Sequence, residues 1–575
     1  MRLLAAALLA LVLAGPASAA DTQNLSEQRV ERIFLRNGKV SDWLDRYPEQ
    51  GRSVNADYRK KTDDWEVHVW WASAGEIATG LVDDRTGSVT EAWTGPQVAW
   101  KMARGLPGAF GGKTLNRVPV WLAFCAAFLI GLADFRRPLS LRNLDLLALL
   151  SFSISLRFFN GGDIFTSAPL AYPPLLYLLA RMVWIGFRGL GGVSRRPLWP
   201  VWLLAAATVF LVGFRIGLNV TQPKPNVIDV GYSGVIGAQR IANGQSPYGH
   251  FPRSDDDLKA CGTPDADGEV HDRVQKNGRC ESANERGDTY GPVAYLAYIP
   301  AYLVFGWHGK WDKLPAAHAT SIAFDLAALV LLGLVGLRFG GQRLGVTLAF
   351  AWASYPFTQY VLSSNTNDSI APVLLLLGFL FVVSAWARGV TTALAGWTKF
   401  GSLLLVPLWS SYPRALERRS LGRFALGFGV ATAAAFSILL LEPDVGHAAR
   451  LFFDRTFGWQ LGRDSPFSIW GWGQYHADGI PDLAVLQKVL VGAVALGAVA
   501  LAFVPRRRTP IAVAALTAAV LIGFQLTLTH WFYLYIPWFF PFVALAVLAP
   551  RRARTPPPVE VEQRDRPSRE LVAAG

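Results

Sequence analysis

Long apolar stretches recur through most of this 575-residue chain, and they restrict its fold more than any other feature. About 13 of them follow one another from residue 118 onward, separated by polar segments. Many approach the ~17–25 residues that a helix needs to cross the hydrocarbon core of a bilayer. Backbone polar groups in such a core must be bonded within the protein, which favours helices. The sequence therefore predicts an all-α polytopic membrane protein.

The apolar stretches have boundaries that can be read directly from the sequence. They comprise residues 118–133, 144–158, 170–187, 199–220, 292–305, 316–337, 344–362, 370–386, 390–408, 424–441, 486–504, 511–527 and 532–548.

Positive charge follows the same alternation. The chain has 55 Lys and Arg against 42 Asp and Glu, a formal net charge of +13. In a soluble protein this excess would suggest a nucleic-acid partner. Here the arginines cluster between apolar stretches, where the positive-inside rule accounts for them, so we expect a multi-pass protein of the cell membrane and no nucleic-acid partner. That rule predicts that the loops 221–290 and 442–485 lie outside the cytoplasm.

Residues 291–410 allow two arrangements. If every apolar stretch spans once, Asp368 faces the cytoplasm. If 292–305 and the region around Lys399 are interfacial or re-entrant, Asp368 lies outside and Arg388 joins the cytoplasmic charges. We favour the second arrangement because it obeys the charge rule better.

The two ends of the chain carry different signals. Residues 1–20 have a basic start, an apolar run and small residues at a cleavage-like site, which indicates a secretory signal peptide. An uncleaved anchor is the alternative. Residues 550–575 are rich in proline and charge, which predicts a disordered cytoplasmic tail.

Two of the three cysteines share one polar loop. Cys261 and Cys280 lie in the loop predicted to be outside, where conditions are oxidising, so we predict a disulfide between them. A zinc pair is the weaker alternative because no suitably spaced ligands stand beside them. Cys125 lies in an apolar run and is expected to pack there.

Residues 21–105 are predicted to form a small α+β extracytoplasmic domain. The apolar residues of 26–44 have helical spacing, and those of the segment 55–93 alternate as in strands joined by turns. With the turn Asp83-Asp-Arg-Thr-Gly87, this pattern resembles the PepSY-type domain. The resemblance implies a binding or regulatory module, and no catalytic constellation is visible in it.

Polar side chains gather in three regions: between 229 and 290, at 363–368 together with 397–399, and at 454–471 together with the turn at 530–533. Such groups at a membrane face suit a reaction between a lipid-linked phosphosugar and a polar acceptor. A carboxylate can take the acceptor proton, cations can hold the phosphate and aromatic rings can stack on sugars. The candidate substrate-binding residues are Arg240, Tyr248, Asp288, Tyr290, Asp368, Lys399, Arg455, Arg463, His530 and Tyr533.

Plain structural roles compete with these assignments. Asp229 and Asp368 can cap helices, Lys399 can extend to the bilayer surface, and Arg455 and Arg463 can be ordinary loop charges. The acidic run 255–269 lacks the full ligand spacing of a calcium loop. No cofactor is certain, no metal ligands are assigned, and a divalent metal stays an alternative.

An ordered set of motifs carries a second resemblance. Asp229 follows an apolar stretch, Gly244-Gln-Ser-Pro-Tyr248 comes next, and Tyr290-Gly-Pro292 opens the following stretch. Later come an Asn-Thr-Asn-Asp sequence ending at Asp368, then a Thr-Lys pair at 398–399 and His-Trp-Phe-Tyr at 530–533. In this order they resemble the GT-C fold glycosyltransferases that use polyprenol-phosphate sugars, closest to a mannosyltransferase-like bacterial branch.

The resemblance implies a GT-C-like core over residues 199–549, with 118–198 as accessory helices. It implies inverting transfer of a mannose-like sugar from a polyprenyl-phosphate donor, on the outer face of the membrane, with Asp229 as catalytic base. The partners would be that donor, a glycan, lipid or protein acceptor of the cell envelope, and membrane lipid. Tyr-Gly-Pro departs from the family's usual Tyr-Pro-Pro, and Asp163 before Tyr172-Pro-Pro174 is a reserve candidate for the base.

Two other functions compete with glycosyl transfer. A transporter or flippase of lipid-linked sugars would show broken helices in two related halves and charges deep in several spans, whereas the charges here stand mostly at the ends of the apolar stretches. A sensor would use the 21–105 domain to bind a ligand, but only short loops and the tail could receive its signal.

Overall fold

The computed structural model describes residues 23–60, 62–71, 75–95, 98, 114–160, 164–188, 199–221, 227–255, 257–263, 270, 272–311, 314–414, 417–463, 465–471 and 483–550. The predicted signal peptide, the end of the predicted 21–105 domain, Asp163, about half of the acidic run 255–269 and nearly all of the predicted tail lie outside these residues. The chain divides into two compact units, one of which contains residues 1–104 and the other most of the remainder. Each unit is described by itself.

The N-terminal unit is a helical pair on a four-stranded antiparallel sheet. The strands pair in the order β1 (Arg52–Arg59), β2 (Asp64–Trp71), β3 (Gly75–Asp83) and β4 (Val89–Thr94). Alternate residues of β2 are buried, as its apolar and polar alternation predicts. The inner face packs on Val30 and Phe34 of α2 (Glu27–Leu35). The strands expected from the sequence are therefore present.

One expectation for this unit is wrong in detail. Residues 26–44 form two helices, α2 and α3 (Gly38–Leu44), instead of one. Asn37 stands between them in an extended conformation, and its side chain accepts a hydrogen bond from the Lys39 N–H. Local capping by Asn thus competes with continuation of the helix.

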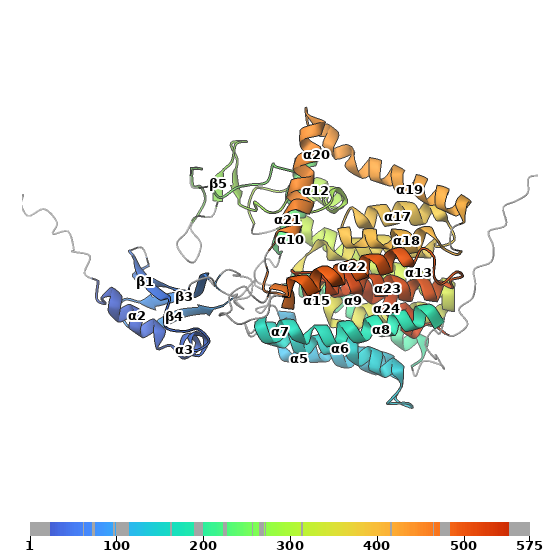
Figure 1. The fold of residues 1–575 in the computed structure, drawn as a ribbon, viewed down its shortest axis with the longest axis horizontal. Helices are drawn as coiled ribbons and strands as arrows, with labels where there is room; N and C mark the ends of the chain where they lie inside the picture. The colour runs from blue at the N-terminus through green and yellow to red at the C-terminus, as the bar shows by residue number, and fades with distance from the viewer. Residues whose placement is uncertain are drawn as a thin grey trace, which may run out of the picture. The chain divides into compact units, whose positions relative to one another are not determined.

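The second unit is almost wholly helical (Figure 1). Its helices are α5 (Val118–Leu132), α6 (Leu141–Asn160), α7 (Ile164–Leu170), α8 (Tyr172–Arg188), α9 (Val201–Val220), α10 (Asp229–Ala242), α11 (Pro292–Leu296), α12 (Ile299–Phe305), α13 (Pro315–Gly340), α14 (Gln342–Ser354), α15 (Pro356–Ser364), α16 (Ile370–Leu380), α17 (Ala385–Gly396), α18 (Val406–Ser410), α19 (Arg418–Phe436), α20 (Val445–Phe453), α21 (Trp459–Leu461), α22 (Ala484–Ala500), α23 (Pro510–Leu526) and α24 (Ile536–Leu548).

Within the described residues, four helical segments are long and apolar enough to cross a membrane. They are Thr166–Arg188, Val201–Val220, Pro315–Gly340 and Arg418–Leu441. Other apolar helices have only 10–17 residues. The described residues are thus compatible with a helical membrane protein, and the predicted count of about 13 spans is not confirmed.

Proline accounts for several of the breaks. The stretch predicted over 344–362 divides at Tyr355, whose extended backbone precedes Pro356. The stretch 292–305 divides into α11 and α12, and Pro300 is near the start of α12. These pieces have 5 and 7 residues, fewer than the ~17–25 that a crossing helix needs. The interfacial or re-entrant arrangement of 292–305 stays a prediction.

The boundaries expected around residue 388 are also wrong. Instead of separating two spans, Arg388 lies inside α17, where only 1% of its surface is exposed. Its guanidinium donates to the carbonyls of Trp409 and Tyr412 at 2.8 and 2.7 Å, and to that of Val382. Arg388 therefore satisfies backbone oxygens at the ends of neighbouring segments, and is not a loop charge.

Helix packing brings distant segments of this unit together. α17 packs on α19, α13 on α14, and α23 on both α8 and α24. Many of these helices run along a common direction in Figure 1, and α10, α20 and α21 lie toward one end of them. Asp229 is the first residue of α10, and Arg455 lies in the turn between α20 and α21.

Candidate functional site

The first turn of α10 lies directly against the turn that follows α15. The N–H of Ile228 donates to the Ser364 carbonyl at 3.2 Å. A Cβ added at Gly231 would lie 2.0 Å from the Asn365 carbonyl oxygen, so only glycine permits this approach. The polar residues of 229 and 364–368, far apart in sequence, are thereby brought side by side.

A second close approach joins the Tyr-Gly-Pro segment to the turn after α17. The N–H of Val293 donates to the Trp397 carbonyl at 3.2 Å, and a Cβ added at Gly291 would lie 2.0 Å from that oxygen. The ammonium of Lys399 consequently lies 4.9 Å from the ring centre of Tyr290. This distance suits a cation–π contact.

Asp368 is held by three side chains. Its Oδ1 lies 3.0 Å from Lys399 Nζ and accepts a hydrogen bond from Trp538 Nε1 at 3.1 Å, while Thr366 Oγ1 donates to Oδ2. The Asp368 side chain is 1% exposed and that of Lys399 is 8% exposed. Both oxygens of this carboxylate are occupied, so Asp368 is suited to orient Lys399 more than to accept a proton.

His530 is fixed between two neighbours in a way that defines its tautomer. Arg463 Nη2 lies 3.3 Å from His530 Nε2, and Ser465 Oγ lies 2.9 Å from Nδ1. Because a guanidinium can only donate, Nε2 must be the acceptor and Nδ1 must carry the proton. Burial and the charges of Arg463 and Lys399 hold the pKa of His530 well below its usual range, so the ring is neutral.

Asp229 differs from Asp368 in its partners. It is the first residue of α10 and is partly exposed. Among the described residues its carboxylate has no ion-pair partner, although the backbone N–H of Val230 stabilises it. Burial in the surrounding protein raises the pKa of Asp229, while Arg463 and Lys399 lower it and Asp368 raises it further. A carboxylate with these properties can accept a proton.

We call the residues that share this site the polar cluster. Its members are Asp229, Tyr290, Asp368, Lys399, Arg463 and His530. The cluster combines the Asp229 carboxylate, which has no ion pair among the described residues, with two cations and a neutral imidazole. Its second carboxylate, Asp368, is saturated, by which we mean that protein groups contact both of its oxygens. Such a site can bind an anion next to a proton acceptor.

Asp288 and Arg455 form an ion pair close to the cluster. Arg455 Nε lies 3.2 Å from Asp288 Oδ2, which also accepts a hydrogen bond from the Gly249 N–H at 2.8 Å. Arg455 belongs to a π-helical turn (Asp454–Gly458), a feature that often marks functional sites. The hydroxyl of Tyr248 donates to the Tyr290 carbonyl at 3.0 Å, which links this pair to the cluster.

Two predicted substrate-binding residues lie elsewhere. Arg240 forms a buried ion pair of 2.6 Å with Glu281. Tyr533 hydrogen-bonds Ser155 and Ser167 through its hydroxyl, at 2.7 Å each, and so joins α24's N-terminal side to α6 and α7. Neither side chain is part of the polar cluster, and both contacts connect elements of the fold.

Three partners of the cluster, Thr366, Ser465 and Trp538, were not among the candidate site residues, although the first two lie in the predicted polar regions. Thr366 and Ser465 each stand two residues from a predicted site residue, so proximity in sequence could have found them. Trp538 lies within an apolar stretch, where a tryptophan gives no signal that separates it from core packing.

In the part of the chain that the structure describes, no group of three or more His, Cys, Asp or Glu side chains could hold a metal ion. The two carboxylates of the polar cluster stand next to cations, which disfavours a further cation between them. No family model, curated protein or solved structure was found to match the chain.

Proposed function

We propose that this protein is a multi-pass membrane glycosyltransferase resembling the GT-C fold enzymes. It transfers a mannose-like sugar from a polyprenyl-phosphate donor to an acceptor of the cell envelope, on the outer face of the membrane. The four long apolar helical segments support membrane insertion. The polar cluster would then stand at the end of the bundle that faces the donor's phosphate.

The observation that carries the proposal is the unequal state of the two carboxylates. Asp368 is saturated by Lys399, Trp538 and Thr366. Asp229 has no ion pair among the described residues, and burial raises its pKa. Carboxylates whose environments differ in this way can divide the roles of base and electrostatic partner.

The proposed reaction gives direct roles to three residues of the polar cluster. Asp229 removes the proton from the acceptor hydroxyl as the oxygen attacks the anomeric carbon of the sugar. The bond between that carbon and the phosphate oxygen breaks, and the configuration inverts. Lys399 and Arg463 stabilise the phosphate that leaves, because charge-assisted hydrogen bonds strengthen as negative charge develops. Lys399 can serve both Asp368 and a phosphate oxygen, since an ammonium has three donors.

A transporter or flippase is the second candidate, and one observation favours it. Arg215 and Asp325 form an ion pair of 2.6 Å inside α9 and α13, although the sequence led us to expect charges mainly at span ends. Charges within membrane helices often mark transport pathways. This pair is, however, fully occupied by protein groups, whereas the polar cluster has an available carboxylate.

The test measures sugar transfer by purified protein in lipid nanodiscs, with radiolabelled polyprenyl-phosphate mannose and a cell-envelope acceptor fraction. Asp229→Asn should lower transfer by about 10²–10⁴-fold while donor binding persists, since a general base contributes that much. Asp163→Asn tests the reserve candidate, and Asp444→Asn, at an exposed helix cap, is the matched control.

Transfer that survives Asp229→Asn would exclude this residue as the base. Transport of the donor across the bilayer without formation of any glycosylated product would favour the second candidate instead.

A further inference from the structure

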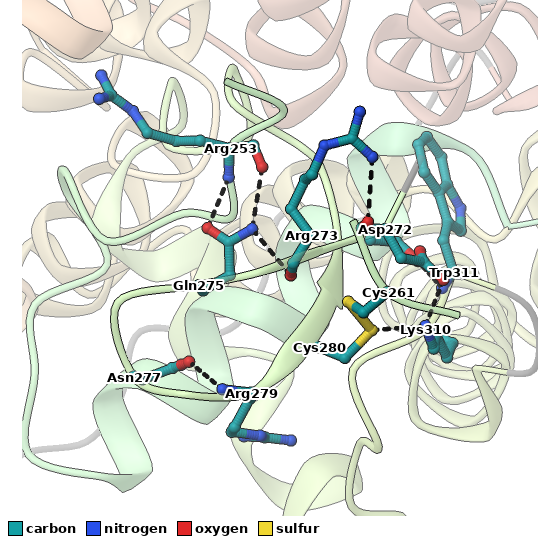
Figure 2. The surroundings of a disulfide bond; sticks show 11 residues. Arg253, Cys261, Asp272, Arg273, Gln275, Asn277, Arg279, Cys280, Lys310 and Trp311 are labelled. Carbon is teal, nitrogen blue, oxygen red and sulfur yellow. Dashed lines mark hydrogen bonds and ion pairs between the residues drawn. A yellow bond between two sulfur atoms is a disulfide. The ribbon is translucent and has the colours of Figure 1, made fainter. Parts of the chain in front are cut away.

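A small hairpin is tied to the rest of its loop by a disulfide. The strands β5 (Asp272–Val274) and β6 (Cys280–Ser282) pair with each other, and Cys280 at the start of β6 is bonded to Cys261. Figure 2 shows the residues around the disulfide, with Lys310 beside the sulfur atoms. The predicted disulfide is therefore confirmed.

The residues that follow Cys280 contact α10 along its length. The buried Glu281 pairs with Arg240 near the end of the helix, at 2.6 Å. The hydroxyl of Tyr232 donates to the Ser282 carbonyl at 2.8 Å. Asn284 Nδ2 donates to Ser233 Oγ at 3.0 Å and to the carbonyl of Asp229 itself at 3.3 Å. Both ends of α10 are thus held by one short segment.

The ion pair between Glu281 and Arg240 is buried, so the contact between β6 and α10 depends on the exact position of β6. The Glu281 side chain is 0% exposed and that of Arg240 is 5% exposed. A buried carboxylate that loses its partner is strongly destabilised, because no water replaces the lost contact. Displacement of β6 would therefore be transmitted to α10 and to the first residue of that helix.

We propose that the Cys261–Cys280 disulfide is a thiol–disulfide exchange site that sets the position of α10. Its reduction loosens α10 and lowers the turnover of the reaction that depends on Asp229. The inference about turnover rests on the proposed function, whereas the inference about α10 does not. Asp229 is the group affected, and residues 280–284 act as positioning residues.

In this exchange Cys280 is the preferred leaving thiolate and Cys261 is the sulfur that is attacked. Lys310 Nζ lies 3.1 Å from Cys280 Sγ and also pairs with Asp272. A neighbouring ammonium stabilises a thiolate, and a more stable thiolate leaves faster. One thiolate of a dithiol reductant attacks Cys261 Sγ, and the S–S bond breaks with its electron pair on Cys280. The second thiolate of the reductant then displaces Cys261, leaving two reduced cysteines and one oxidised dithiol.

The first experiment measures hydrogen exchange of the full-length protein in nanodiscs, before and after treatment with dithiothreitol. Amides of α10 should exchange at least about tenfold faster after reduction, whereas those of α13 should not change. Cys261→Ser with Cys280→Ser should reproduce this result, and Cys125→Ser in α5 is the matched control. Reoxidation of the wild type should restore protection, which separates loosening from unfolding.

Exchange of α10 amides that stays within twofold after complete reduction would overturn the proposal. Loss of α10 protection together with lower transfer would support it in full. If α10 loosens but measurable transfer is unchanged, the link to Asp229 is wrong. If α10 loosens and the intact protein never transfers sugar, the positioning stands and the proposed function fails.

The second experiment tests the direction of exchange. Lys310→Met should slow reduction of the disulfide by about fivefold, as followed by thiol labelling, because the leaving thiolate loses its neighbouring charge. Lys276→Met, in the exposed turn of the same hairpin, should leave the rate unchanged. Equal rates in the two variants would exclude Cys280 as the preferred leaving group.

Discussion

The polar cluster and the Arg215–Asp325 pair both hold charges among apolar helices, but their hydrogen bonding differs. Arg215 donates to Asp325, to the Trp352 carbonyl and to Gln359, at 2.6, 2.8 and 2.9 Å. Trp352 Nε1 also donates to Asp325 at 2.8 Å. In the polar cluster, by contrast, Asp229 lacks an ion pair among the described residues. A saturated charge supports the fold, and an unsaturated one is available to a ligand.

The largest expected effect is on stability, at the saturated pair. Arg215→Met should destabilise the folded protein by about 3–5 kcal/mol, because it leaves the Asp325 carboxylate buried without its partner. Thermal unfolding in detergent measures this effect. Arg215→Met combined with Asp325→Leu should recover most of the loss. Unchanged unfolding of the single variant would remove the distinction between the two regions.

At the polar cluster we expect weaker donor binding together with some loss of stability, because Lys399→Met also leaves the buried Asp368 carboxylate without its ion-pair partner. Lys399→Met should raise the KM for the polyprenyl-phosphate donor about tenfold to hundredfold, as expected for loss of a charge-assisted hydrogen bond. Lys399→Arg retains the charge and should stay within a few fold. Lys488→Met, on an exposed face of α22, is the control. A KM that does not change would separate Lys399 from the donor.

The pH dependence of transfer tests the electrostatics around Asp229. The base must be ionised, so activity is lost as pH falls through the pKa of Asp229, which burial raises and Arg463 lowers. Arg463→Gln removes the lowering influence, so the acid limb of the kcat/KM profile should move to higher pH. A shift to lower pH, or none, would contradict the assignment. The pH profile of Lys488→Met should match that of the wild type.

The smallest effect is expected at His530, which contacts Arg463 without needing a charge. His530→Gln keeps an acceptor for the guanidinium and should reduce kcat only about twofold, whereas His530→Phe should reduce it about tenfold by freeing Arg463. Steady-state kinetics compare the two. If both variants lose activity equally, His530 acts by something other than orientation of Arg463.

Much of the polar cluster could be predicted because several of its members share one property of the sequence. Asp229, Tyr290 and Asp368 all stand near the ends of predicted apolar stretches, and Lys399 was singled out as an ionisable residue inside one. The disulfide was predictable for a similar reason, since both cysteines fall in one polar loop. The local sequence pattern was sufficient to predict a site residue or a disulfide where its place relative to the apolar stretches decides whether it lies in the site.

Contacts between residues far apart in the sequence could not be predicted from the local pattern. Nothing adjacent to Arg240 indicates Glu281, and nothing adjacent to Asp368 indicates Trp538. Arg388 looked like a loop charge, because the carbonyls that it satisfies belong to residues up to 24 positions away. The helix break before Pro356 was similarly hidden, since an apolar composition continues across Tyr355 without interruption.

The close approach at Gly291 bears on how related chains could differ. Its backbone angles, φ −68° and ψ 158°, would suit proline, but any Cβ at this position would collide with the Trp397 carbonyl. A chain with proline at 291 must therefore follow another course at 397–399. In a set of diverged sequences, these two places should change together, so that the residue between Tyr290 and Pro292 reports where the lysine-bearing turn lies.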